Sequence, residues 1–187
     1  MGVIGRAFVA VEPPAEVLAA VEERVRSIRA MADADRVRWS PEVGHATLQF
    51  LGRVDEPDEM VAVLDRAMRA VEPVLARLGG GGAFPRSRRG TVLWLGFTEG
   101  AEALGRLAAA VAGATAQLGF AGEDRGFRPH VTLARTQPAR DLRELVRAVG
   151  DTPVGPTWRV RDVVLLSSET RATGARYSEI SRFRLGG

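Results

Sequence analysis

The chain has 187 residues, of which 45% are hydrophobic and 26% are charged, and its formal net charge is +3. This length and composition predict a globular protein with a real core, and so small a net charge does not by itself indicate a nucleic-acid binder. There is no cysteine, and all 26 basic residues are arginine, which excludes disulfides, thiolate nucleophiles, cysteine zinc sites, Schiff bases and P-loop lysines.

The sequence has no sign of a membrane or export segment. No apolar run approaches the roughly 18 residues that a membrane-spanning helix needs. The opening segment, MGVIGRAFVAVEPP, has too short an apolar stretch and no small-residue cleavage site. We therefore expect a cytoplasmic protein with no membrane partner, and we expect it to be a monomer.

The first part of the chain alternates extended and helical patterns. Strands are predicted at residues 6–12, 37–40 and 45–52, and helices at 15–31 and 57–70. Residues 73–78 fit either an extension of the second helix or a strand. The four consecutive glycines at 79–82 then predict a break in regular structure.

The second part continues with a loop at 84–90, a strand at 91–97 and a helix at 101–118. An irregular stretch leads to a strand at 130–135 and a short helix near 140–149. Two further strands are predicted at 158–167 and 176–183. Because several strands are separated only by short turns, an antiparallel α+β fold is favoured over a doubly wound parallel sheet.

Two tetrapeptides share the pattern His-x-Thr-Leu, and they contain the only two histidines of the chain. They are HATL at residues 45–48 and HVTL at residues 130–133. Each lies on a predicted strand and follows a proline-containing turn. This repetition predicts two related halves, each of which brings one strand to a shared cleft.

Side chains alternate across a strand, so each motif has a polar face and an apolar face. His45 and Thr47 are expected on one face, and His130 and Thr132 on the corresponding face of the second strand. The opposite face of the first strand is expected to form core, with the side chains of Ala46, Leu48 and Phe50.

Two imidazoles and two hydroxyls do not complete a zinc site, which takes three or four strong protein ligands. They suit phosphoryl chemistry without metal or cofactor, in which one imidazole takes a proton from water and the other gives one to the departing oxygen. The hydroxyls would hold non-bridging phosphate oxygens. A strained cyclic diester needs only these groups, and the common one in cells is a 2′,3′-cyclic phosphate. The residues alone do not say which histidine donates.

The motifs and their surroundings resemble the 2H phosphoesterase superfamily, and within it the RNA 2′,3′-cyclic phosphodiesterases formerly called 2′-5′ RNA ligases. The matching segments are HATLQFLG at 45–52, FRPHVTLAR at 127–135, FP at 84–85 and VLWLG at 92–96, within a similarity that runs from RAFVA at 6–10 to GARY at 174–177. The resemblance implies one domain, residues 1–187, built of two intertwined and pseudo-symmetric lobes with one motif each. Each lobe would have an antiparallel sheet lining a central cleft, with helices packed outside.

The same resemblance implies the activity and the roles of the motif residues. The reaction is hydrolysis of RNA 2′,3′-cyclic phosphate ends to 2′-phosphates, and the partners are RNA 3′ ends or cyclic-phosphate nucleotides. His45 would be the proton donor to the leaving 3′ oxygen and His130 the proton acceptor from water, with Thr47 and Thr132 as phosphate ligands.

Further substrate contacts are predicted beside the motifs. On a regular strand Arg135 lies on the opposite face from His130, but a bulge would bring it to the phosphate. Aromatic side chains stack on the bases of single-stranded RNA, and the candidates are Phe8, Phe50, Trp94 and Phe127. Phe8 and Phe127 border the predicted cleft more closely than Trp94, for which core and cleft are equally possible. Cations in the loop after Phe84 would attract an RNA backbone, unless they belong to an ordinary exposed loop; they are Arg86, Arg88 and Arg89.

Two other classes of function fit part of this pattern. The physiological reaction of an enzyme with these motifs could be 2′-5′ RNA ligation or hydrolysis of a cyclic nucleotide, which the motifs do not separate from hydrolysis of an RNA end. A non-catalytic module that binds RNA ends is expected to lose a motif His or Thr. All four are present, which argues for an enzyme.

Overall fold

The structure is a computed structural model that describes residues 2–31, 34–40, 44–122, 126–171 and 174–186. In chain order its elements are β1 (Ile4–Val11), α1 (Ala15–Arg29), η1 (Ala34–Arg36), β2 (Arg38–Trp39), β3 (Ala46–Val54), α2 (Pro57–Arg69), β4 (Val74–Phe84), η2 (Ser87–Arg89), β5 (Gly90–Glu99), α3 (Ala101–Ala116), β6 (Val131–Arg140), α4 (Arg143–Val149), β7 (Pro153–Val160), β8 (Asp162–Arg171) and β9 (Gly174–Arg184). Within these ranges, no helix has both the length and the apolar character needed to cross a bilayer.

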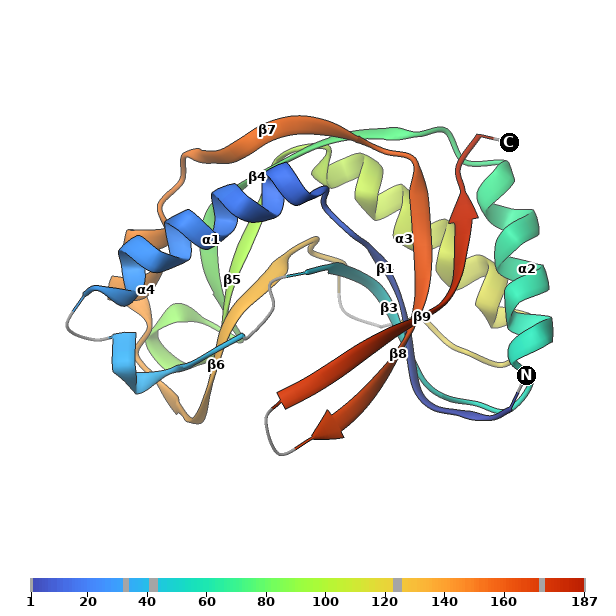
Figure 1. Ribbon diagram of the computed structural model, residues 1–187, viewed down its shortest axis with the longest axis horizontal. Coiled ribbons are helices and arrows are strands. Elements are labelled where there is room, and N and C mark those ends of the chain that lie inside the picture. Colours follow the sequence, from blue (N-terminus) through green and yellow to red (C-terminus); the bar gives the residue numbers. More distant parts are fainter. Residues whose placement is uncertain (1, 32–33, 41–43, 123–125, 172–173, 187) are drawn as a thin grey trace.

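The strands form one curled sheet in the order β7-β4-β5-β6-β3-β1-β8-β9, and β2 pairs with β6. Every pairing is antiparallel. In the middle of the sheet, β3 and β6 are joined by the pair Ala46↔Val131. The sheet therefore divides into two halves that meet at this junction, which confirms the predicted α+β fold with two antiparallel halves (Figure 1).

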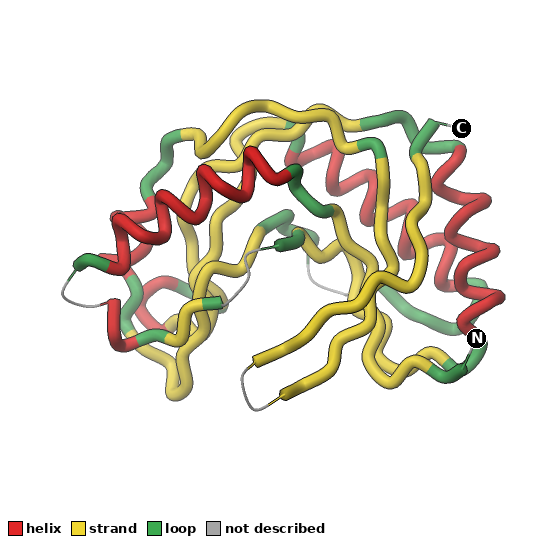
Figure 2. The backbone as a smooth tube through the Cα atoms, viewed as in Figure 1, coloured by secondary structure: helices red, strands yellow, loops and turns green. Residues whose placement is uncertain are grey.

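The helices lie outside the curled sheet and are exchanged between its halves (Figure 2). Helix α1 follows β1 in the chain, but it packs on β7 and α4 of the other half. Helix α3 follows β5, yet it packs on β3 and α2. Because each of these helices crosses the junction, neither half has a complete core of its own.

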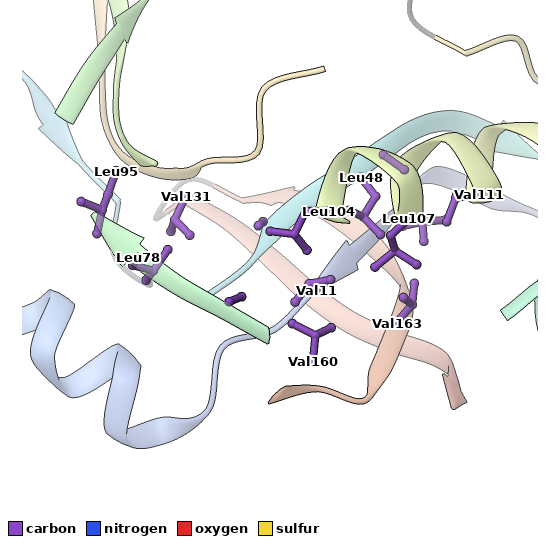
Figure 3. Packing of buried hydrophobic residues seen from close by; sticks show 14 of the residues in the cluster. Val11, Leu48, Leu78, Leu95, Leu104, Leu107, Val111, Val131, Val160 and Val163 are labelled. Atoms are coloured by element: carbon purple, nitrogen blue, oxygen red, sulfur yellow. The ribbon is translucent and has the colours of Figure 1, made fainter. Parts of the chain in front are cut away.

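The core lies between the helices and the convex side of the sheet. On α1 the buried residues recur at helical spacing, at Val17, Val21, Val25 and Ile28, as expected for a helix with one apolar face. Figure 3 shows Leu104 and Leu107 of α3 packed near Leu48 of β3. The concave side of the sheet is therefore left for residues that do not belong to this core.

The glycine run at 79–82 does not break the structure, so this expectation was wrong. Strand β4 continues through it and pairs with both β5 and β7. A Cβ added to Gly82 would overlap the ring carbons of Trp94, because the indole lies directly across this residue. Glycine is needed here for close approach of a side chain, which a sequence pattern cannot distinguish from a flexible loop.

The single strand predicted at 158–167 is also wrong, because this stretch contains parts of two strands. Strand β7 ends at Val160 and β8 begins at Asp162. Strand β7 pairs with β4 in one half, while β8 pairs with β1 in the other. Only these long-range pairings show that the chain changes halves at Arg161.

The packing around Gly82 generates a stability prediction. Gly82→Ala should lower the free energy of unfolding by about 1–3 kcal/mol, because the new methyl group must displace the Trp94 ring. The matched control is Gly113→Ala on an exposed face of α3, where nothing lies within 4 Å of the added Cβ and helix propensity should raise stability by up to about 1 kcal/mol. Urea unfolding should show a lower free energy of unfolding for Gly82→Ala than for the wild type, and a higher one for Gly113→Ala. A Gly82→Ala protein as stable as the wild type would contradict this prediction.

Candidate active site

The two motif histidines lie at the central junction of the sheet. His45 directly precedes β3 and His130 directly precedes β6, and the next residue of each, Ala46 and Val131, forms the pair that joins the halves. Both imidazoles line one cleft of about 1850 Å³, together with Thr47 and Thr132. The four residues predicted to act together are thus brought to one concave face.

A bulge in β3 changes which side chains reach that face. Val9 of β1 pairs with Gln49 and the next residue, Ala10, pairs with Thr47, so Leu48 is an extra residue in the ladder. The alternation shifts by one position after a bulge. Gln49 consequently points inward, where it is 4% exposed and its Oε1 accepts a hydrogen bond of 2.8 Å from the Thr115 hydroxyl.

The same bulge means that Phe50 does not lie on the core face, where regular alternation would place it, while stacking of its ring on a base stays a prediction. Its side chain is 61% exposed and lines the cleft. The expectation assumed regular alternation from His45 onward, and the extra residue at Leu48 reverses that alternation.

Strand β6 contains the equivalent bulge. Trp94 of β5 pairs with Thr132 and the preceding Leu93 pairs with Ala134, so Leu133 is the extra residue. Ala134 is buried, and Arg135 is turned to the cleft that it lines. A bulge that would turn Arg135 to the cleft was one of two arrangements that the sequence allowed, and the structure contains it.

The two bulges put different chemistry at equivalent positions. Phe50 is the fifth residue after His45, and Arg135 is the fifth residue after His130. One half therefore presents an exposed aromatic ring to the cleft, and the other half presents a cation. The backbone frame is pseudo-symmetric, but the site is not.

His45 lies in an aromatic pocket that disfavours its charged form. The ring centroids of Phe8 and Tyr177 are 4.9 and 4.7 Å from that of His45. Burial, followed by the nearby charges of Arg135 and His130, lowers the pKa of His45 from 6.5 to about 4. In the free protein this imidazole is therefore neutral at neutral pH.

His130 is held in a different way. Its Nδ1 donates a hydrogen bond of 2.8 Å to the Arg128 carbonyl oxygen, since a carbonyl can only accept. In the neutral ring the lone pair is then on Nε2. The ring of Phe84 packs edge-on at 4.9 Å, and Trp94 lies behind at 6.1 Å. This arrangement fixes the orientation of the imidazole and makes Nε2 its basic nitrogen.

The aromatic residues predicted at the cleft are placed at different depths. Phe8 is only 3% exposed and supports His45 from behind, while Phe127 is 38% exposed on the cleft wall. Trp94 is 7% exposed and belongs to the packing behind His130. Tyr177, which is 36% exposed, was given no role from the sequence, because β9 reaches His45 only through the pairing of β8 with β1.

The arginine loop lies beside the cleft. Phe84 and Pro85 line the cleft, but the three arginines that follow are not among its lining residues; they are Arg86, Arg88 and Arg89. Arg88 is close enough to Asp141 to contribute to the lowered pKa of that carboxyl, whose main cause is the hydrogen bond from Arg143. A contact of this loop with RNA stays a prediction.

The groups in the cleft are chemically able to act as an acid and base pair with anion ligands. Both imidazoles and the hydroxyls of Thr47 and Thr132 line it, together with four arginines, which are Arg6, Arg38, Arg128 and Arg135. In the part of the chain that the structure describes, no group of three or more His, Asp or Glu side chains is placed to hold a metal ion. The residues present fit proton transfer around a bound phosphate.

Comparison with known proteins agrees with this geometry. Residues 13–172 match the family described as the 2′-5′ RNA ligase superfamily. A Thermus thermophilus protein named RNA 2′,3′-cyclic phosphodiesterase is 34% identical over 97% of this chain and 91% of its own length. An Aquifex aeolicus protein of the same name is 34% identical over 80% of this chain and 82% of its own length.

Solved structures extend the likeness to the whole fold. A crystal structure of a Thermus thermophilus protein aligns with a TM-score of 0.78 at 31% identity, covering 97% of this chain and 98% of that one. Apo LigT of Escherichia coli aligns with a TM-score of 0.72 at 28% identity, covering 98% and 99% of the two chains. The family match over residues 13–172 and the relatives of at least 30% identity confirm the resemblance inferred from the sequence, and the chain belongs to the 2′-5′ RNA ligase superfamily.

Proposed function

We propose that this protein is an RNA 2′,3′-cyclic phosphodiesterase that opens cyclic phosphate ends to 2′-phosphates without a metal or cofactor. The observation that carries the proposal is the convergence of His45, His130 and Arg135 with the two motif threonines on one concave face. Relatives of this name support it. So does the crystal structure of Escherichia coli LigT with 3′-AMP, a ribonucleotide, which is 28% identical with a TM-score of 0.70.

In the proposed complex the reacting phosphate lies between the two motifs. Thr47 and Thr132 are equivalent in the two halves, and each hydroxyl donates a hydrogen bond to one non-bridging oxygen. Arg135 offsets the single negative charge of the diester, and a guanidinium can do so with two parallel hydrogen bonds. The phosphorus is thereby held between the imidazoles.

His130 is the proton acceptor in this mechanism. Its Nε2 takes a proton from the attacking water as the new oxygen–phosphorus bond forms. The Arg128 carbonyl oxygen, which already accepts a hydrogen bond from Nδ1–H, stabilises the imidazolium that results. The geometry of this hydrogen bond is the structural reason for giving His130 the role of base.

His45 is the proton donor, and it has to be charged to act. Its pKa is about 4 in the free protein because burial and the charges of Arg135 and His130 disfavour the imidazolium. A bound phosphate anion opposes the effect of Arg135 and favours the imidazolium. Binding of the substrate therefore prepares the donor, which gives its proton to the 3′ oxygen as the bond from phosphorus to that oxygen breaks.

The same groups would also serve neighbouring reactions. A ribose hydroxyl in place of water gives 2′-5′ ligation, and a cyclic mononucleotide can occupy the same phosphate position. No feature of the site favours these over hydrolysis of an RNA end. One catalytic domain over residues 1–187, a cytoplasmic location and a monomeric state stay predictions from the sequence.

The paired-histidine mechanism predicts strongly coupled losses of activity. His45→Ala and His130→Ala should each lower turnover by about 10² to 10⁴, the usual value of general acid or base help. The double variant should lose far less than the product of the single losses, because both groups act in one displacement. The assay uses a short RNA with a 2′,3′-cyclic phosphate end, with the product phosphate mapped to the 2′ position. Near-normal turnover by either single variant, when shown to be folded, would contradict the mechanism.

The low pKa of His45 predicts a particular dependence of stability on pH. Its folded pKa of about 4 is below its ordinary 6.5, so the unfolded chain takes up this proton first as the pH falls. Stability that is present above pH 6.5 is therefore lost between pH 6.5 and 4. From pH 7 to pH 5 this group should cost about 2 kcal/mol, and His45→Gln should lose that much less stability over the same range. Parallel denaturant titrations at both pH values test this, and identical losses for the two proteins would show that the pKa is not lowered.

The proposal also predicts that chelation has no effect. Because proton transfer uses only side chains of this chain, full turnover should survive excess EDTA and extensive dialysis. Loss of activity that zinc or manganese restores would reject the mechanism.

A further inference from the structure

Resting on the proposed function, we propose that Arg38 is a specificity residue that binds the phosphate on the 5′ side of the terminal nucleotide. Arg38 lies next to Arg135, which binds the reacting phosphate in the proposed mechanism. This second phosphate position makes the enzyme selective for the end of an RNA chain over an isolated nucleoside cyclic phosphate.

The pairing of β2 with β6 determines where Arg38 lies. Arg38 is directly opposite Arg135, and Trp39 is opposite Ala134. Residues directly opposite in an antiparallel pair share a face. Trp39 packs against the core and Ala134 is buried, so the neighbouring Arg38 and Arg135 both face the cleft, which they line.

The charges of these two arginines are close together, and no carboxylate among the described residues pairs with either. Like charges directly opposite each other destabilise a strand pair. In the described part of the chain, no hydrogen bond or ion pair joins Arg38 or Arg135 to a carboxylate. Surface arginines elsewhere, such as Arg53 and Arg143, are paired with Asp55 and Asp141. The cleft pair is thus suited to a ligand with more than one negative charge.

The chemistry of the substrate identifies the second anion. A 2′,3′-cyclic phosphate carries one negative charge, which one arginine balances. From a 3′-terminal nucleotide the RNA chain continues only through the 5′ oxygen, so the nearest other phosphate is the one on that oxygen. The cleft of about 1850 Å³ exceeds the roughly 300–1,000 Å³ of pockets for small ligands, which leaves room for this continuation.

The test compares two substrates that differ only at the 5′ oxygen. One is adenosine 2′,3′-cyclic phosphate with a free 5′ hydroxyl, and the other carries a methyl phosphodiester there. The wild type should prefer the second by on the order of tenfold in kcat/KM, since a hydrogen bond to a charged group is worth roughly 1.5–3 kcal/mol. In Arg38→Gln the ratio of the two kcat/KM values should fall to near one. Arg159→Gln, an exposed position on β7 that does not line the cleft, removes the same charge and should keep the wild-type ratio.

The possible outcomes separate this inference from the proposed function. No preference in the wild type, or equal losses on both substrates in Arg38→Gln, would overturn the second phosphate position. If the wild type hydrolyses neither substrate, the proposed activity fails, and the affinities of the same pair are measured by calorimetry. A preference in binding that Arg38→Gln abolishes would then still support the phosphate position, and equal affinities would reject it.

Discussion

The single pair Ala46↔Val131 is the constraint on which the rest of the site depends. It joins the two halves of the sheet, and each of its residues directly follows a histidine. Because the β3–β6 ladder is centred there, the two imidazoles necessarily meet at one place on the concave face. Helices α1 and α3, which cross to the opposite halves, hold this junction together by giving the halves a common core. Catalytic geometry and the stability of the fold thus rest on the same contacts.

The bulges at Leu48 and Leu133 then make a symmetric frame chemically asymmetric. Each turns the fifth residue after its histidine toward the cleft. In one half this residue is Phe50, whose ring is 61% exposed and available to a base. In the other it is Arg135, next to Arg38. A nucleotide whose base stacks on Phe50 and whose cyclic phosphate contacts Arg135 would have a single orientation in such a cleft, which is what the proposed acid and base roles require.

Features that depend on neighbouring residues in the sequence could be predicted, whereas features that depend on pairing with a distant strand could not. The helices could be found from apolar spacing, and the paired motifs from the repetition of His-x-Thr-Leu around the only two histidines. Regular alternation placed Phe50 on the core face although its ring was also a candidate for base stacking, and the sequence could not decide between the two, because a bulge is defined by the partner strand. Tyr177 escaped for the same reason, since its place beside His45 depends on the order of β9, β8 and β1 in the sheet. The glycines at 79–82 looked like a break because the Trp94 ring that needs Gly82 comes from β5.

The electrostatics of the cleft order the events of the proposed reaction. With the cleft empty, Arg38 and Arg135 attract an anion, and burial together with the charge of Arg135 lowers the pKa of His45 and keeps it neutral. A charged His45 would be costly in so buried a place beside the guanidinium of Arg135. Entry of phosphate removes that cost, so protonation of the donor follows binding and does not precede it. Arg135 therefore has two effects in the proposed reaction: it attracts the anion, and together with burial it keeps the proposed acid neutral until a substrate is present.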